Sequence, residues 1–134
     1  MTFPIGGRVR KSILIVVALA VAAVGLARFA RSQTPDPLDP LRVAPDTHKI
    51  AFENQFVLVL DVHVPAGKTE PRHRHPHGMS VYFTDWDAKV TVDGGQPEVR
   101  HRAPGTFAWS DAIVHTVENV GKTEGHILRI ELKF

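Results

Sequence analysis

Histidine is the residue type in this chain that could bind a metal ion, and its spacing indicates where. The chain carries eight histidines, and three of them, His73, His75 and His77, stand in the segment HRHPH. Alternate residues of a β-strand share a face, so His73 and His75 are expected to point into one cavity. Two neighbouring imidazoles cannot both be charged without repulsion, and both are satisfied when they are neutral and bind one metal ion. A third ligand has to come from a distant strand, and we assign it to His115.

The other histidines are assigned by the same reasoning. His77 is the candidate fourth ligand because it continues the alternation, although Pro76 before it leaves its direction open. The rest carry no motif and are predicted to be structural or exposed: His48, His63, His101 and His126. Two alternatives stay open: His73 and His75 could line a metal-free pocket, and His115 could be an ordinary strand histidine.

Two motifs, about 40 residues apart, resemble those of the cupin family. The first motif of that family is a glycine, five residues and then His-x-His, and here its residues are Gly67, His73 and His75. The second runs from a Pro-Gly turn to a histidine that is followed, after three residues, by an asparagine. Its residues here are Pro104, Gly105, His115 and Asn119. The resemblance covers residues 46–134 and is to small single-domain bacterial cupins of the RmlC-like type.

The resemblance implies an all-β fold, the cupin-type double-stranded β-helix or jelly-roll barrel, behind an N-terminal apolar helix. The residues after Pro45 independently favour a barrel or a sandwich, because short apolar and β-branched segments alternate with turns. No segment after Ser32 keeps a helical period of 3.6 residues. We predict strands at residues 49–52, 56–64, 81–84, 89–92, 98–102, 106–109, 113–117 and 126–133.

The expected metal site departs from the family's pattern in one ligand. Most metal-binding cupins have a glutamate separated from the second histidine by three or four residues, and here those positions hold Met79 and Ser80. The resemblance therefore implies a three-histidine site. Three neutral imidazoles hold Fe²⁺, Zn²⁺, Mn²⁺, Ni²⁺ or Cu²⁺ and leave positions open for water or a substrate. Because a ligating imidazole has to be neutral, we expect the affinity for metal to fall below about pH 6.5.

The function that these residues imply is the binding of a divalent transition metal and a small organic molecule. If the domain is an enzyme, dioxygenase-like oxidation at a three-histidine iron is the first expectation, and metal-assisted isomerisation or hydrolysis is the second. The competing class is a non-catalytic binding or sensing module. No residue stands out as a general base, so the sequence does not decide between an enzyme and a binder, and it assigns no catalytic residue.

The first 45 residues predict a targeting segment and a linker. Before Ser32 the chain has five basic residues and no acidic one, and residues 13–27 form an apolar run. This layout is typical of a secretory signal peptide, with cleavage after Ala27, or of a single membrane anchor. Either would place the domain in the periplasm or at the outer face of the inner membrane. Four prolines in residues 32–45 favour an extended linker, so we divide the chain into residues 1–31, 32–45 and a barrel domain, 46–134.

Charge and composition limit the partners. Five of the 16 Lys and Arg precede Ser32 whereas all 14 Asp and Glu follow it, so the rest of the chain nets −3 and offers nucleic acid no basic domain. The absence of cysteine excludes disulfides and zinc–thiolate sites. Four arginines near the motifs are expected to be solvated at the rim of the pocket, or else to receive an anionic substrate: Arg72, Arg74, Arg100 and Arg102. A small molecule is the expected ligand, and a homodimer stays open.

Overall fold

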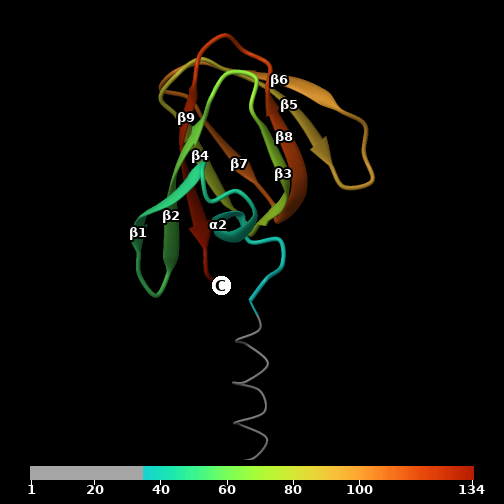
Figure 1. Ribbon diagram of the computed structural model, residues 1–134. Helices are drawn as coiled ribbons and strands as arrows, with labels where there is room; N and C mark the ends of the chain where they lie inside the picture. Colours follow the sequence, from blue (N-terminus) through green and yellow to red (C-terminus); the bar gives the residue numbers. More distant parts are fainter. Residues whose placement is uncertain (1–34) are drawn as a thin grey trace, which may run out of the picture. The chain divides into compact units, whose positions relative to one another are not determined.

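The computed structural model describes residues 35–134, which form one short helix and nine β-strands (Figure 1). The helix, α2, covers Pro40–Val43. The strands are β1 (His48–Glu53), β2 (Val57–Val64), β3 (Thr69–His75), β4 (Gly78–Tyr82), β5 (Trp86–Val92), β6 (Glu98–Arg102), β7 (Phe107–Ser110), β8 (Ile113–Asn119) and β9 (Gly125–Leu132). The prediction of an all-β domain is confirmed.

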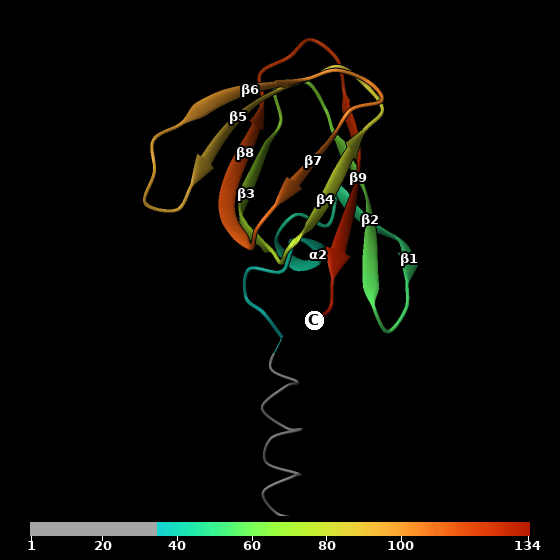
Figure 2. The ribbon, with the colours of Figure 1, turned by 180° about the vertical axis from the view of Figure 1, so that it is seen from behind.

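The strands form two antiparallel sheets. One has the strand order β1-β2-β9-β4-β7 and the other the order β3-β8-β5-β6. From β2 to β5, and again from β6 to β9, each strand lies in the opposite sheet from the one before it, which wraps the two sheets around a common interior. The β1–β2 and β5–β6 hairpins extend at opposite sides of this barrel (Figures 1 and 2). The predicted double-stranded β-helix is the architecture observed.

The core lies between the two sheets, where the inward-facing residues of the strands meet. In β9 every second residue from Gly125 to Glu131 is buried, which is the period of two expected for a strand with one buried face. Burying a large apolar side chain stabilises a fold by about 1.5–3 kcal/mol. The buried apolar cluster comprises Leu60, Val62, Val64, Trp86, Ala88, Val90, Val117 and Ile127.

Gly125 allows β9 to pass against the ring of Trp86. A Cβ atom at Gly125 would lie 1.9 Å from Cε3 and 2.0 Å from Cζ3 of that ring. Because the indole is part of the core and has little room to shift, we expect Gly125→Ala to destabilise the fold by about 1–3 kcal/mol, the usual cost of overpacking. Urea denaturation measures this change directly.

Gly95 provides the matched control for this substitution. It lies in the exposed turn after β5, and the nearest atom to an added Cβ would be the carbonyl oxygen of Val92 at 3.3 Å. Gly95→Ala is therefore expected to change the stability much less. Equal effects of the two substitutions would contradict the close packing of Gly125 on Trp86.

The predicted linker over residues 32–45 is wrong from Asp36 onward, because residues 36–134 form one compact unit. The carboxylate of Asp39 accepts a hydrogen bond of 2.9 Å from the backbone N–H of Leu41, which caps the first turn of α2. Pro40 occupies that first turn, where its missing N–H costs nothing. Leu41 packs against the core and Ala44 is 1% exposed. Residues 36–45 therefore belong to the barrel domain.

The part of the chain that the structure describes contains no helix long and apolar enough to cross a membrane. The apolar run at residues 13–27, on which the predicted signal peptide or anchor rests, lies outside the described residues, as does the expected N-terminal apolar helix.

Candidate metal centre

Strands β3 and β8 bring the histidines of the two motifs together. In β3 the buried residues are Glu70, His73 and His75, so both histidines face the interior. Strand β8 pairs with β3 in antiparallel register, and His115 is the direct partner of His73. Residues about 40 positions apart in the sequence thus lie side by side.

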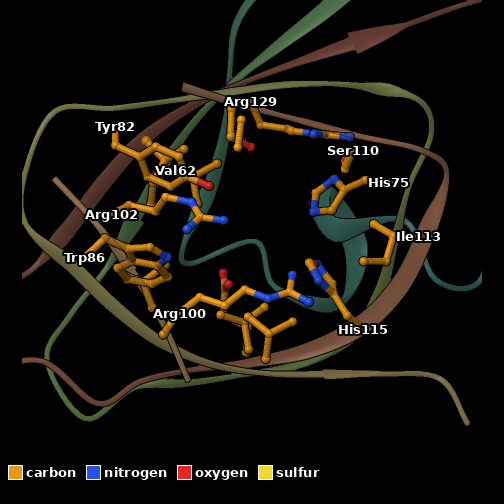
Figure 3. A pocket seen from close by; sticks show the side chains of 18 of the residues that line it. Val62, His75, Tyr82, Trp86, Arg100, Arg102, Ser110, Ile113, His115 and Arg129 are labelled. Atoms are coloured by element: carbon orange, nitrogen blue, oxygen red, sulfur yellow. The ribbon is translucent and has the colours of Figure 1, made fainter. Parts of the chain in front are cut away.

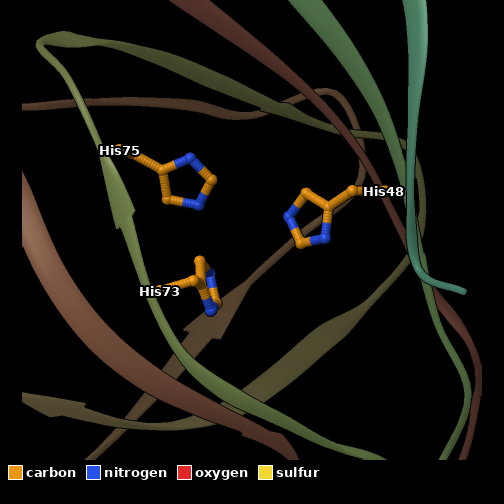
Figure 4. A group of neighbouring side chains, drawn as sticks. All are labelled: His48, His73 and His75. Carbon is orange, nitrogen blue, oxygen red and sulfur yellow. The ribbon is translucent and has the colours of Figure 1, made fainter. Parts of the chain in front are cut away.

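Four imidazole rings converge inside the barrel. The ring centroids of His73 and His115 are 4.6 Å apart, those of His73 and His75 4.9 Å, and those of His75 and His115 5.4 Å. The fourth ring belongs to His48 of β1, at 5.4 Å from His73 and 5.7 Å from His75. His48, His73 and His75 face one another (Figure 4), and each offers a ring nitrogen within 4.8 Å of the other two.

Hydrogen bonds fix which nitrogen of each ring carries the proton. His73 Nδ1 donates to the carbonyl oxygen of Pro71 at 2.6 Å, because a carbonyl can only accept. His75 Nδ1 lies 2.5 Å from a carboxyl oxygen of Glu131. Each ring therefore has its Nδ1 bound to a neighbouring oxygen and its Nε2 left for a further partner. Ligating histidines in metal sites are usually held in this way.

The ring of His48 is held in the same manner by a pair of buried side chains. Its Nδ1 is 3.0 Å from the hydroxyl oxygen of Thr47 and 3.3 Å from a carboxyl oxygen of Glu70. The Thr47 hydroxyl in turn donates to Glu70 at 2.5 Å. The Nδ1 of His48 is thus the donor to Thr47, and its Nε2 is again the nitrogen without a proton.

The distance between one pair of ring nitrogens fits a shared ion. Nε2 of His115 lies 3.0 Å from Nε2 of His73. Two metal–nitrogen bonds of about 2.0–2.1 Å, at a tetrahedral or octahedral angle, place their nitrogens roughly 2.8–3.4 Å apart. The donor set of the described residues therefore fits a divalent transition metal ion.

The cluster is neutral because it is buried. Burial, reinforced by the neighbouring imidazoles, lowers the pKa of His48 to about 3 and that of His115 to about 2. Burial also lowers the pKa of His73, and it lowers the pKa of His75 well below its ordinary value. Neutral imidazole is the form that can bind a metal, and the four imidazoles are in this form in the folded chain at neutral pH.

The arrangement of strands can be compared with known structures. A cupin domain from Bordetella pertussis Tohama I has a TM-score of 0.60 and 22% identity, and the match covers 65% of this chain and 92% of that one. An RmlC-like cupin with a double-stranded β-helix fold from Methanocaldococcus jannaschii has a TM-score of 0.52 and 11% identity, covering 63% and 77%. This chain has the cupin fold. No protein-family profile and no curated protein matches the sequence.

A cavity runs from the histidine cluster of the cupin barrel toward the surface. It encloses about 160 Å³ and is lined by residues of both sheets, including His48, His73, His75 and His115. Ser80 of β4, one of the two positions where metal-binding cupins have the glutamate, also lines it. A small organic molecule can therefore reach the imidazoles.

Two buried carboxyl groups stand behind the histidines, and the sequence did not single out either. Burial raises the pKa of Glu70, which is bonded to Thr47 beside His48, to about 7. Burial likewise raises the pKa of Glu131, which is bonded to His75, to about 7. Both carboxyls can take up a proton near neutral pH, and both hold an imidazole in place.

The remaining residues of the predicted site lie elsewhere in the cupin barrel. His77 is exposed, its Nδ1 is 3.4 Å from a carboxyl oxygen of Asp111, and it does not line the described cavity. Asn119 is buried but serves the loops: its amide nitrogen donates to the carbonyl oxygens of Val64 and Thr123, at 2.8 and 2.9 Å. The structure therefore joins His73, His75 and His115, and it leaves His77 outside.

A second group of potential ligands lies on the outer face of the barrel. His63 of β2 and His126 of β9 are direct partners across the sheet, with ring centroids 4.1 Å apart. A carboxyl oxygen of Asp61 is 2.8 Å from Nε2 of His126. These side chains are partly exposed, and any study of metal binding has to separate them from the interior cluster.

Proposed function

We propose that this cupin domain binds one divalent transition metal ion through His73, His75 and His115 and takes a small organic molecule beside it. The observation that carries the proposal is the convergence of three neutral imidazoles in the barrel interior: Nδ1 of His73 and Nδ1 of His75 are already bonded, and Nε2 of His115 lies 3.0 Å from Nε2 of His73. Imidazole suits Fe, Mn, Ni, Cu and Zn. A bound ion would supply Lewis acidity or redox chemistry at the inner end of the cavity.

We propose His48 as the fourth ligand, in place of the glutamate that Met79 and Ser80 do not provide. Its Nε2 carries no proton, and its Nδ1 is held by Thr47 and Glu70. An octahedral ion with four protein ligands keeps two open positions. A site of four neutral imidazoles also keeps the full charge of the ion, whereas a carboxylate ligand would reduce it.

Dioxygenase-like oxidation of a small molecule is the reaction to test first, because it would require O₂ as the oxidant and, from the protein, a redox-active ion with open positions. A specific observation supports the second candidate, a non-catalytic binding module. Among the described residues that line the cavity, Glu70 is the only carboxyl, and Thr47 and His48 engage it. No described carboxyl group that lines the cavity is thus free to act as a general base on a ligand.

Metal titration tests the proposal. Protein purified without a polyhistidine tag is expected to bind one ion at the interior cluster, and a chelator is expected to lower its melting temperature by removing the stabilisation that binding supplies. We expect His115→Ala to weaken interior binding by about 100-fold, because it removes a ligand while leaving the other rings in place. Calorimetric titration measures both the affinity and the number of sites.

His63→Ala is the matched control for this experiment. It removes one histidine from the outer group of Asp61, His63 and His126, and it is expected to leave interior binding unchanged. The proposal is contradicted if His115→Ala binds metal as well as the original chain does, or if His63→Ala abolishes all binding.

A further inference from the structure

Three arginine side chains line the same cavity as the histidines. Arg100 and Arg102 come from β6 and Arg129 from β9. The guanidinium groups of Arg100 and Arg102 face the space into which His75 and His115 point, and the side chain of Arg129 lies along the edge of that space beside Ser110 (Figure 3). The cationic end of the cavity therefore adjoins the proposed metal site.

Arg129 is buried without the partners that a buried charge requires. Its side chain is 5% exposed, and its Nη2 donates to the carbonyl oxygen of Pro76 at 2.6 Å. Its Nε is a buried nitrogen with no hydrogen-bond partner among residues 35–134. Glu131, on the same face of β9, attracts it through space, but no described carboxylate lies within 4.0 Å of it. A buried guanidinium charge without a counter-ion destabilises the fold, and an anion bound beside it would reduce this cost.

Arg102 and Arg100 differ in how far their charge is neutralised. A guanidinium nitrogen of Arg102 donates to the carbonyl oxygen of His101 at 2.9 Å, and the group lies 5.9 Å from the centroid of the Tyr82 ring. Neither contact supplies a negative charge. Arg100 is paired with Glu98, at 2.8 Å. Arg129 and Arg102 are thus the cations of this cavity without a carboxylate in the described part of the chain.

The charge of the cavity is opposite to that of the domain around it. Three guanidinium groups face one carboxyl, that of Glu70, whereas the chain from Ser32 onward nets −3. A metal ion held by neutral imidazoles would make the cavity more positive. The other walls are apolar and include Trp86, Val90 and Ile127.

We propose that the cavity binds a small organic acid whose carboxylate is received by Arg129 and Arg102 and whose apolar body lies against Trp86, Val90 and Ile127. A guanidinium group matches a carboxylate with two parallel hydrogen bonds, which Nε and a terminal nitrogen of Arg129 could offer after a small movement of the side chain. This inference rests on the proposed function in that it names the ligand class of the same cavity. It does not require the metal to be present.

Calorimetric titration with three probes tests the inference: butanoate, its neutral analogue butanamide, and inorganic phosphate. Each is titrated into metal-loaded and into chelator-treated protein. Butanoate is expected to bind at least about tenfold tighter than butanamide, because a hydrogen bond to a charged group is worth roughly a factor of ten or more. Arg129→Gln is expected to weaken butanoate by about 10- to 100-fold while leaving metal content unchanged.

Two further variants make the result decisive. Arg102→Gln, at a less buried position, repeats the test if Arg129→Gln does not fold. Arg72→Gln is the matched control, because Arg72 is exposed, pairs with Asp93 and does not line the cavity. The inference is wrong if butanoate and butanamide bind with equal affinity, or if no probe binds. It is also wrong if phosphate alone binds, because the ligand is then an inorganic anion. If the original chain binds no metal but still discriminates butanoate from butanamide, this inference stands and the proposed metal function is wrong.

Discussion

A chain that begins at Asp46 is expected to be less stable than one that begins at Pro35, by roughly 3–5 kcal/mol. The segment that such a truncation removes contains Leu41, which packs against the core, and Ala44, which is 1% exposed. It also carries backbone acceptors: the carbonyl oxygen of Ala44 accepts from the N–H groups of Thr47 and His48, at 3.2 and 3.1 Å. Urea denaturation of the two shortened chains gives the difference.

The same truncation is expected to weaken metal binding, because the removed segment contacts the two strands that carry three of the four imidazoles. The backbone N–H of Arg74, between the two histidines of β3, donates to the carbonyl oxygen of Leu38 at 2.8 Å, and His48 is held by Ala44. Asp36→Ala in the longer chain is the control, since it removes only the ion pair with Arg74 and a hydrogen bond from the backbone N–H of Leu38, and it should cost much less than the truncation. Two shortened chains of equal stability and equal metal affinity would contradict this role of residues 36–45.

The strands that the sequence predicted well are those with an alternating apolar pattern. Strand β9 (Gly125–Leu132) and strand β2 (Val57–Val64) lie within one residue of the predicted ranges, because one buried face imposes a period of two. Strand β3 (Thr69–His75) was absent from the predicted set, although two of its histidines were placed on a strand. Its sequence, TEPRHRH, has no apolar run, since its inward positions are polar residues of the site.

The site was predictable only as far as its motifs extend. Histidines His73, His75 and His115 were expected to meet, and the pairing of β3 with β8 brings them together; their role as ligands stays a prediction. No spacing could have indicated His48, because its direction follows from its register opposite Val62, whose side chain is in the core. That register is set by the packing of the whole sheet.

Two motif residues, Gly67 and Asn119, stabilise the fold of the barrel and do not take part in the site. Gly67 adopts a positive φ of 76°, which favours glycine, and its N–H donates to the carbonyl oxygen of Asn119 at 2.9 Å. The backbone N–H of Asn119 donates to the carbonyl oxygen of Lys68, also at 2.9 Å. These contacts join the loop before β3 to the end of β8. The motif residues Gly67 and Asn119 therefore mark the connection that aligns the two histidine-bearing strands.

The metal-free protein is expected to lose stability gradually below about pH 6.5, where free histidine takes up its proton, and more steeply below about pH 4.5. A histidine with a lowered pKa in the fold contributes stability that is fully present above 6.5 and is lost as the pH falls toward its folded value. For His48 and His115 those folded values are about 3 and about 2. Each contributes a slope of about 1.4 kcal/mol per pH unit between the two values, and His73 and His75 act in the same direction.

The buried carboxyls oppose this loss between pH 7 and 4.5. A carboxyl whose pKa is raised in the folded chain is protonated in that chain at a higher pH than in the unfolded chain. Its contribution to stability therefore grows as the pH falls from the pKa in the folded chain to the pKa of 4.5 in the unfolded chain. Glu70 and Glu131 both have folded values of about 7, and in the pair of Glu131 with His75 this proton belongs to the pair as a whole. Their uptake offsets about two of the four protons that these histidines take up in the unfolded chain, so the stability still falls in this range, but about half as steeply as without the carboxyls.

Below pH 4.5 the unfolded chain has protonated its glutamates as well, and the offset stops growing. His48 and His115 alone then lower the stability by roughly 4 kcal/mol between pH 4.5 and 3. The expectation that metal affinity falls below pH 6.5 changes for the same reason: the folded ligands stay neutral, so affinity should persist to a lower pH than in an exposed histidine pair.

Substitution of both carboxyls separates the two effects. In Glu70→Gln/Glu131→Gln no proton uptake opposes the histidines, so the stability of the metal-free chain should fall about twice as steeply below pH 6.5 as that of the original chain. Chemical denaturation at a series of pH values between 8 and 3 measures both curves. The argument fails if the original chain loses stability as steeply just below pH 6.5 as it does below pH 4.5, or if the double variant follows the same curve as the original, because the buried glutamates would then not offset the imidazoles that they hold.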